Sequence, residues 1–155
     1  MHNPFSPPSA RIEDIGAPKG SGIKAVAIGL LVDIGGTVLA SFLLLFIYAF
    51  GLLASGVSEN EFMEAMLNIQ HDSWVLVIGI VIGFFFSVLG GYFCARVARH
   101  SEYKFGLILS GISIITGFPF GIGMVSLLMN VALSIGSFVS VMAGVWLGVF
   151  RNRAV

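Results

Sequence analysis

The sequence predicts an all-α membrane protein: a four-transmembrane-helix bundle with a short outer amphipathic helix between helices 1 and 2. Of its 155 residues, 57% are hydrophobic and only 10% are charged, whereas soluble domains carry about 25% charged residues. Uninterrupted apolar regions cover residues 34–54, 74–95 and 105–150, and about 20 apolar residues in a helix cross a bilayer. The last region is long enough for two helices joined by a turn.

Residues 1–22 are predicted to form a disordered cytoplasmic tail. They include every proline of the chain except Pro119 and contain no apolar run, whereas a secretory signal peptide needs an apolar core of about 7 to 15 residues. We therefore expect the apolar run 25–54 to be an uncleaved first span. Residues 23–155 are expected to form the four-helix transmembrane domain.

The segment between the first two spans, residues 55–73, predicts a short helix on the outer membrane surface. Ser58 followed by Glu61 matches a capping box, and apolar side chains follow on one helical side. Acidic residues and His71 also lie in this segment, but their spacing fits no metal-ligand pattern. A solvated acidic face is therefore preferred to a cation site.

The third and fourth spans are predicted at residues 105–121 and 126–150. Pro119 falls where the turn between them is needed, and proline disfavours a helical conformation at the residue before it, Phe118. A simple turn is the preferred interpretation. The alternative is a re-entrant segment, which requires cover from protein or water at that depth.

The basic residues predict the orientation of these spans. They precede the first span, surround the turn between the second and third, or follow the fourth, and are Arg11, Lys19, Lys24, Arg96, Arg99, Lys104, Arg151 and Arg153. The other two connections carry no Lys or Arg. By the positive-inside rule, both termini are expected to be cytoplasmic.

Small residues at four-residue spacing predict the faces through which the helices pack. The positions are Ala25, Gly29, Asp33, Thr37 and Ser41 in helix 1; Gly79, Gly83, Ser87, Gly91 and Ala95 in helix 2; Ser113, Gly117 and Gly121 in helix 3; and Ala132, Gly136, Ser140, Gly144 and Gly148 in helix 4. We expect Gly79, Gly83, Gly91, Gly136, Gly144 and Gly148 to form packing ridges. The partner helix can belong to this chain or to another.

Asp33 is the only charged residue inside the run 25–54. It lies nine residues after Lys24, or roughly 13 Å along a helix axis, so it belongs to the inner half of the span. Its place on the small-residue face turns it toward other helices. Intramembrane ionisable residues normally have a partner, and depth favours Arg96, so a structural Asp33–Arg96 ion pair is predicted.

Non-enzymatic function is expected, as a structural, assembly or accessory membrane component that binds a membrane-protein partner or a second copy of itself. No catalytic motif occurs in the sequence, and no cofactor or metal is expected. Eight basic residues balanced by eight acidic ones disfavour nucleic-acid binding. The alternative is a small proton- or ion-linked transporter or channel that uses Asp33, with hydroxyl groups such as Ser113 and Thr116 along its path.

Three segments carry a resemblance: HNPFSPP near the start, VDIGGT in the first span, and GGYFCARVARHSEYKFG at the end of the second. They resemble segments of small uncharacterised four-span bacterial inner-membrane proteins that begin with an Asn-Pro-aromatic-x-Pro-Pro motif. The resemblance implies a multi-pass protein of the bacterial plasma membrane. It implies no activity, substrate or catalytic residue.

Overall fold

The computed structural model describes residues 21–69, 73–122 and 125–153, and their regular structure is helical throughout. The elements are α1 (Gly22–Leu30), the π-helical turn η1 (Leu31–Gly35), α2 (Gly36–Ala54), α3 (Glu59–Leu67), α4 (Ser73–Ala98), α5 (Glu102–Gly121) and α6 (Leu127–Arg153). Within this part of the chain, three helices are long and apolar enough to cross a membrane: 22–54, 74–98 and 127–153. The tail, its HNPFSPP motif, and His71 fall outside the described residues.

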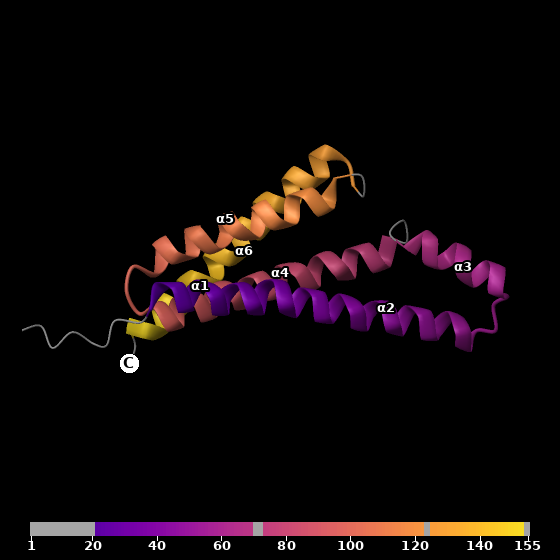
Figure 1. Cartoon of the computed structure of the whole chain (residues 1–155), viewed down its shortest axis with the longest axis horizontal. Helices are drawn as coiled ribbons and strands as arrows, with labels where there is room; N and C mark the ends of the chain where they lie inside the picture. Colours follow the sequence, from indigo (N-terminus) through magenta and orange to yellow (C-terminus); the bar gives the residue numbers. More distant parts are fainter. Residues whose placement is uncertain (1–20, 70–72, 123–124, 154–155) are drawn as a thin grey trace, which may run out of the picture.

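Two opposite ends of the molecule are convenient landmarks. At the basal end α1 begins, α4 ends, α5 begins and α6 ends; at the distal end α2 leads into α3, and α5 turns back into α6 (Figure 1). Every Lys and Arg of the described residues lies at or near the basal end, where the helices carry Lys24, Arg96, Lys104, Arg151 and Arg153 and the α4–α5 connection carries Arg99. The described basic residues are thus confined to the basal end, whereas acidic residues occur both at the distal end, in α3, and at the basal start of α5, where Glu102 lies.

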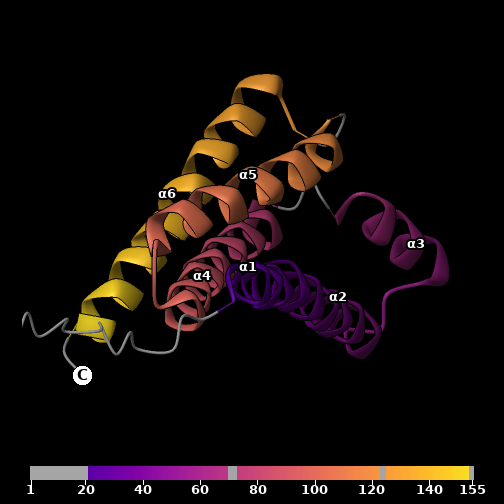
Figure 2. The same ribbon diagram turned by 60° about the vertical axis from the view of Figure 1, so that its left-hand side comes forward.

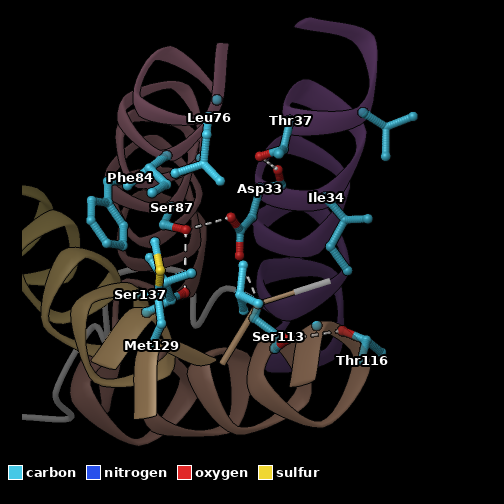
Figure 3. Close-up of a pocket in the computed structure, with 17 residues that line it drawn as sticks. Asp33, Ile34, Thr37, Leu76, Phe84, Ser87, Ser113, Thr116, Met129 and Ser137 are labelled. Atoms are coloured by element: carbon cyan, nitrogen blue, oxygen red, sulfur yellow. Dashed lines mark hydrogen bonds between the residues drawn. The ribbon is translucent and has the colours of Figure 1, made fainter. Parts of the chain in front are cut away.

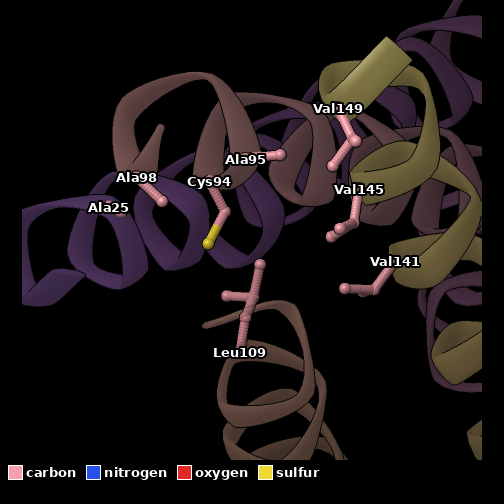
Figure 4. Close-up of a cluster of buried hydrophobic side chains, with 8 residues drawn as sticks. All are labelled: Ala25, Cys94, Ala95, Ala98, Leu109, Val141, Val145 and Val149. Atoms are coloured by element: carbon pink, nitrogen blue, oxygen red, sulfur yellow. The ribbon is translucent and has the colours of Figure 1, made fainter. Parts of the chain in front are cut away.

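The apolar core lies in the basal half. It contains Cys94, Ala95 and Ala98 from α4, joined by side chains from α1, α5 and α6 (Figure 4). Leu109, Val141 and Val145 are its largest fully buried members. Most members of this core are small, so four helices approach closely around it, as expected where lipid supplies no hydrophobic drive for helix association.

Glycine residues produce the closest of these helix contacts. A methyl group on Gly91 would overlap the carbonyl of Val141, and one on Gly144 would overlap the carbonyl of Val88. A methyl group on Gly148 would lie 2.7 Å from the Ala95 Cβ atom. The prediction that Gly91, Gly144 and Gly148 form packing ridges is consistent with this α4–α6 contact, which lies within one chain.

Toward the distal end the helices separate. The α5–α6 hairpin diverges from the pair formed by α2 and α4, as two views show (Figures 1 and 2). The helix α2 has no buried residue at all. One distal contact between α2 and α4 is an aromatic pair, Tyr48 and Trp74, with ring centroids 5.8 Å apart.

The short helix α3 forms as its capping box predicts. The Ser58 hydroxyl accepts from the Glu61 N–H, and the Glu61 carboxylate accepts from the Ser58 N–H at 2.9 Å. The hydrogen bond from the Ser58 N–H above all, and one that the Ser58 hydroxyl donates to the same carboxylate, hold the pKa of Glu61 below its usual value of 4.5. The amphipathic helix between the first two long helices is therefore confirmed.

The Pro119 segment differs from the expectation. α5 continues through Phe118 and Pro119 to Gly121, so Phe118 is helical although it precedes a proline. Pro119 stands near the C-terminal end of the helix, and the Asn130 side chain of α6 donates to the Phe118 carbonyl at 3.0 Å. Phe118 is among the last four residues of α5, whose carbonyls have no partner within the helix, so this bond supplies the missing donor.

Candidate functional site

Asp33 sits at the centre of a π-helical turn. The five residues LVDIG form η1 between α1 and α2, at the Gly35–Gly36 pair, which the sequence marks as a packing position or a helix bend. π-helical turns are rare and occur frequently at functional sites. The Thr37 hydroxyl donates to the Asp33 carbonyl at 2.6 Å, and two low-propensity residues, Gly35 and Gly36, follow directly.

The Asp33 carboxylate links three helical elements. Ser87 of α4 donates to one carboxylate oxygen at 2.8 Å, and Ser113 of α5 donates to the other at 2.7 Å (Figure 3). The Ser87 hydroxyl is also 3.5 Å from that of Ser137 in α6. Asp33 is only 5% exposed, so these hydroxyl groups replace water around a buried carboxylate, as its desolvation requires.

Arg96, the predicted partner of Asp33, is not among these hydrogen-bond partners. Asp33 lies opposite Gly90, whose added methyl group would be 2.8 Å from the Asp33 Cβ atom. This crossing places Ser87, one turn earlier in α4, within reach of the carboxylate. Arg96 follows Ser87 by nine residues, roughly 13 Å along the axis, and belongs to the last turn of α4.

A cavity of about 630 Å³ opens beside Asp33, on the distal side of the apolar core (Figure 3). Its wall includes residues from η1, α2, α4, α5 and α6. The polar lining residues are Asp33, Thr37, Ser87, Ser113, Thr116 and Ser137. The rest of the wall is apolar or glycine, including Leu76, Phe84, Met129 and Leu133.

The glycines of the predicted packing ridges fall into two groups: some line this cavity, and others make close contacts between helices. Gly79 and Gly83 line it, and a methyl group on either would have no neighbour within 4 Å. Gly136 instead makes room for the Phe84 ring, because its methyl group would lie 2.5 Å from the Phe84 Cζ atom. The basal ridge positions therefore serve packing inside the chain, and the distal ones of α4 border open space.

A second cavity, of about 470 Å³, extends this open space toward the distal end. It shares Leu76, Gly79 and Val125 with the first, and Ser41 and Ile69 also line it. The two spaces thus follow the same face of α4.

Other polar residues of the predicted path have structural roles. Ser110 and Ser134 donate to backbone carbonyls of their own helices, and Asn130 bonds to α5. Sequence reasoning placed Ser87 and Ser113 on packing faces but missed that they hold Asp33. Their four-residue spacing contained the signal, since a hydroxyl on a packing face is available to a carboxylate on the facing helix.

No protein-family model, curated protein or solved structure matches this chain. Its function is therefore inferred from the Asp33 site itself.

Proposed function

We propose that this chain is a four-span protein of the bacterial inner membrane with both termini in the cytoplasm. Three helices have the length and hydropathy to cross a membrane, and α5 adds 20 residues, or roughly 30 Å of helix, close to the thickness of the hydrocarbon core. The basic residues at the basal end support a cytoplasmic location for that end. The resemblance of VDIGGT and GGYFCARVARHSEYKFG to bacterial proteins supports the choice of membrane.

We further propose that the protein is non-enzymatic and acts as a small proton- or ion-linked transporter or channel through Asp33. One observation carries this proposal: a carboxylate that is 5% exposed stands in the wall of a cavity of about 630 Å³. Ionisable groups at membrane depth are costly and commonly mark ion or substrate pathways. The cavity has the volume of a small-molecule site, about 300 to 1,000 Å³.

The distribution of the glycines favours this function over a purely structural one. Gly91, Gly144 and Gly148 are consumed by the α4–α6 contact within the chain. They supply no free surface for a partner. The open positions, Gly79 and Gly83, face the same cavity as Asp33.

Flux measurements in proteoliposomes test the proposal. The Asp33→Asn variant has nearly the same shape but no charge, and its amide oxygen can accept from one serine while its NH2 group can donate to the hydroxyl oxygen of the other. It is expected to abolish proton- or cation-dependent flux. Glu64→Gln is the matched control, because Glu64 is an exposed carboxylate on α3. Equal flux from wild type and folded Asp33→Asn would refute the role of Asp33.

A second candidate is an accessory or assembly component that binds a partner's transmembrane helix or a second copy of the chain. The observation in its favour is the open small-residue pair Gly79 and Gly83 on α4, at the spacing that lets two helix backbones approach. A stoichiometric partner recovered after mild detergent extraction should then be lost in Gly79→Ile and Gly83→Ile. Retention of the partner in both variants excludes this face as its binding site.

A further inference from the structure

We propose that the ligand of the Asp33 cavity is a lipophilic organic monocation, whose positive group binds the Asp33 carboxylate while its apolar body fills the space beside α4. This inference rests on the proposed function and names its substrate class. It follows from the charge, the donor groups and the wall of the cavity.

The charge of the site calls for one positive group. Among the described residues that line the cavity, Asp33 is the only Asp or Glu, and none is Lys, Arg or His. Each carboxylate oxygen accepts one serine hydroxyl, and a carboxylate offers about four acceptor positions in all. Acceptor capacity therefore remains for a bound cation, which would neutralise a charge that the neutral serines only solvate.

The wall disfavours a bare metal ion. Calcium takes about six to eight oxygen ligands, and magnesium needs a near-octahedral oxygen shell. Among the described residues, no group of three or more His, Cys, Asp or Glu side chains is placed to hold a metal. A single carboxylate with hydroxyl groups on one side and apolar side chains elsewhere suits a cation that carries its own apolar surface.

The aromatic lining adds a second feature that fits an organic cation. Phe84 lies one turn from Ser87 on α4 and lines the cavity (Figure 3). Gly136 of α6 leaves room for this ring, so the ring is seated between α4 and α6 in the wall of the cavity that Asp33 lines. Aromatic faces attract organic cations, more strongly where water is excluded.

Size and route are consistent with a membrane-borne ligand. The cavity of about 630 Å³ is lined by residues of α2, α4, α5 and α6. The α5–α6 hairpin diverges from α2 and α4 toward the distal end (Figure 2). The cavity is open in front of three lining glycines, because a methyl group on any of them would meet nothing within 4 Å; they are Gly79, Gly83 and Gly117. These three positions therefore carry no side chain that would obstruct a compound moving from the bilayer to Asp33.

Equilibrium binding of tetraphenylphosphonium to the full-length protein in detergent tests the inference. Tetraphenylborate is the matched probe, since it has nearly the same size and shape and the opposite charge. Wild type should bind tetraphenylphosphonium saturably at one site per chain and should not bind tetraphenylborate. Asp33→Asn should weaken binding by about 30-fold or more, as expected when one member of a buried charge pair is lost, whereas Asp33→Glu should retain it.

Gly83→Leu provides a variant that keeps Asp33. A Cβ atom at Gly83 meets no neighbour within 4 Å, so the leucine side chain can enter the cavity and should block the probe without unfolding the protein. Glu64→Gln should bind as wild type does. Thermal unfolding in detergent identifies folded variants, and if Asp33→Asn is unfolded, the comparison rests on Gly83→Leu and Asp33→Glu.

The inference is overturned if tetraphenylborate binds as well as tetraphenylphosphonium, if the cation does not bind to wild type, or if folded Gly83→Leu binds it unchanged. Loss of cation binding together with persistent Asp33-dependent proton or sodium flux would overturn this ligand class and leave the proposed function standing. Absence of both would remove the proposed function as well.

Discussion

Gly29 and Gly90 face each other where α1 crosses α4, and a Cβ atom added to Gly90 would lie 2.8 Å from the Gly29 carbonyl oxygen. The same added atom would lie 2.8 Å from the Cβ atom of Asp33. The crossing thus sets both the separation of two helices and the position of the carboxylate. Ser87 can reach Asp33 only because no side chain stands at Gly90.

Gly90→Ala is therefore expected to destabilise the fold by about 1 to 3 kcal/mol, the usual cost of overpacking a close contact. It should also weaken any Asp33-dependent binding, because the carboxylate must shift away from Ser87. Thermal or chemical unfolding in detergent measures the first effect. Gly79→Ala is the matched control on the same helix, since its methyl group enters open space and alanine has the higher helix propensity.

Ser87→Ala and Ser113→Ala should each destabilise the protein by about 1 to 3 kcal/mol, because each leaves a buried carboxylate oxygen without its donor. The two effects should not add, since both serines bind one carboxylate. A double-mutant cycle on unfolding free energies measures the coupling. Ser134→Ala removes a hydroxyl that bonds only within its own helix and should have a smaller effect, so equal losses at all three serines would contradict the assigned geometry.

The capping box of α3 predicts a pH dependence at the distal end. Hydrogen bonds from Ser58 lower the pKa of Glu61 from 4.5, so this carboxylate stabilises α3 above that value. The stabilisation is lost as pH falls through the lowered pKa of the folded state. Hydrogen exchange of the α3 amides should therefore accelerate on acidification, and Glu61→Gln should reduce this dependence while Glu64→Gln preserves it.

Cysteine labelling tests the four-span orientation. Ser58→Cys before α3 and Ile122→Cys after α5 should react with a membrane-impermeant reagent added from outside intact spheroplasts, and Ser101→Cys should react only after lysis. Cys94 is fully buried, so the native thiol should contribute little background. Outside labelling at Ser101, or its absence at Ile122, would require a different topology.

Local features of this fold are predictable from the sequence. The Ser58–Glu61 capping box depends on residues three positions apart, and its predicted hydrogen bonds form. The spacing of Gly91, Gly144 and Gly148 likewise marks positions where helices approach. Short-range chemistry and helix periodicity are sufficient for both.

The environment of Asp33 could not be predicted in the same way. Its partners Ser87 and Ser113 are 54 and 80 residues away in the chain, and their proximity depends on where helices cross. Counting depth along a straight α-helix favoured Arg96, but the crossing at Gly29 and Gly90 and the π-helical turn at Asp33 change the alignment. The four-residue spacing marks Gly29 as a packing position, but it does not specify which residue of α4 faces it.

Because the apolar core is confined to the basal end, a small rotation there would produce a larger displacement at the distal end of the α5–α6 hairpin. α6 has 27 residues and is therefore roughly 40 Å long, with its contacts to α4 through Gly144 and Gly148 at the basal end. From Gly148 to Leu127 the helix runs 21 residues, or roughly 32 Å, so a rotation of about 5° at Gly148 would move the distal end of α6 by roughly 3 Å. A small rotation near Gly148 would thus change the separation of the distal ends of α6 and α4.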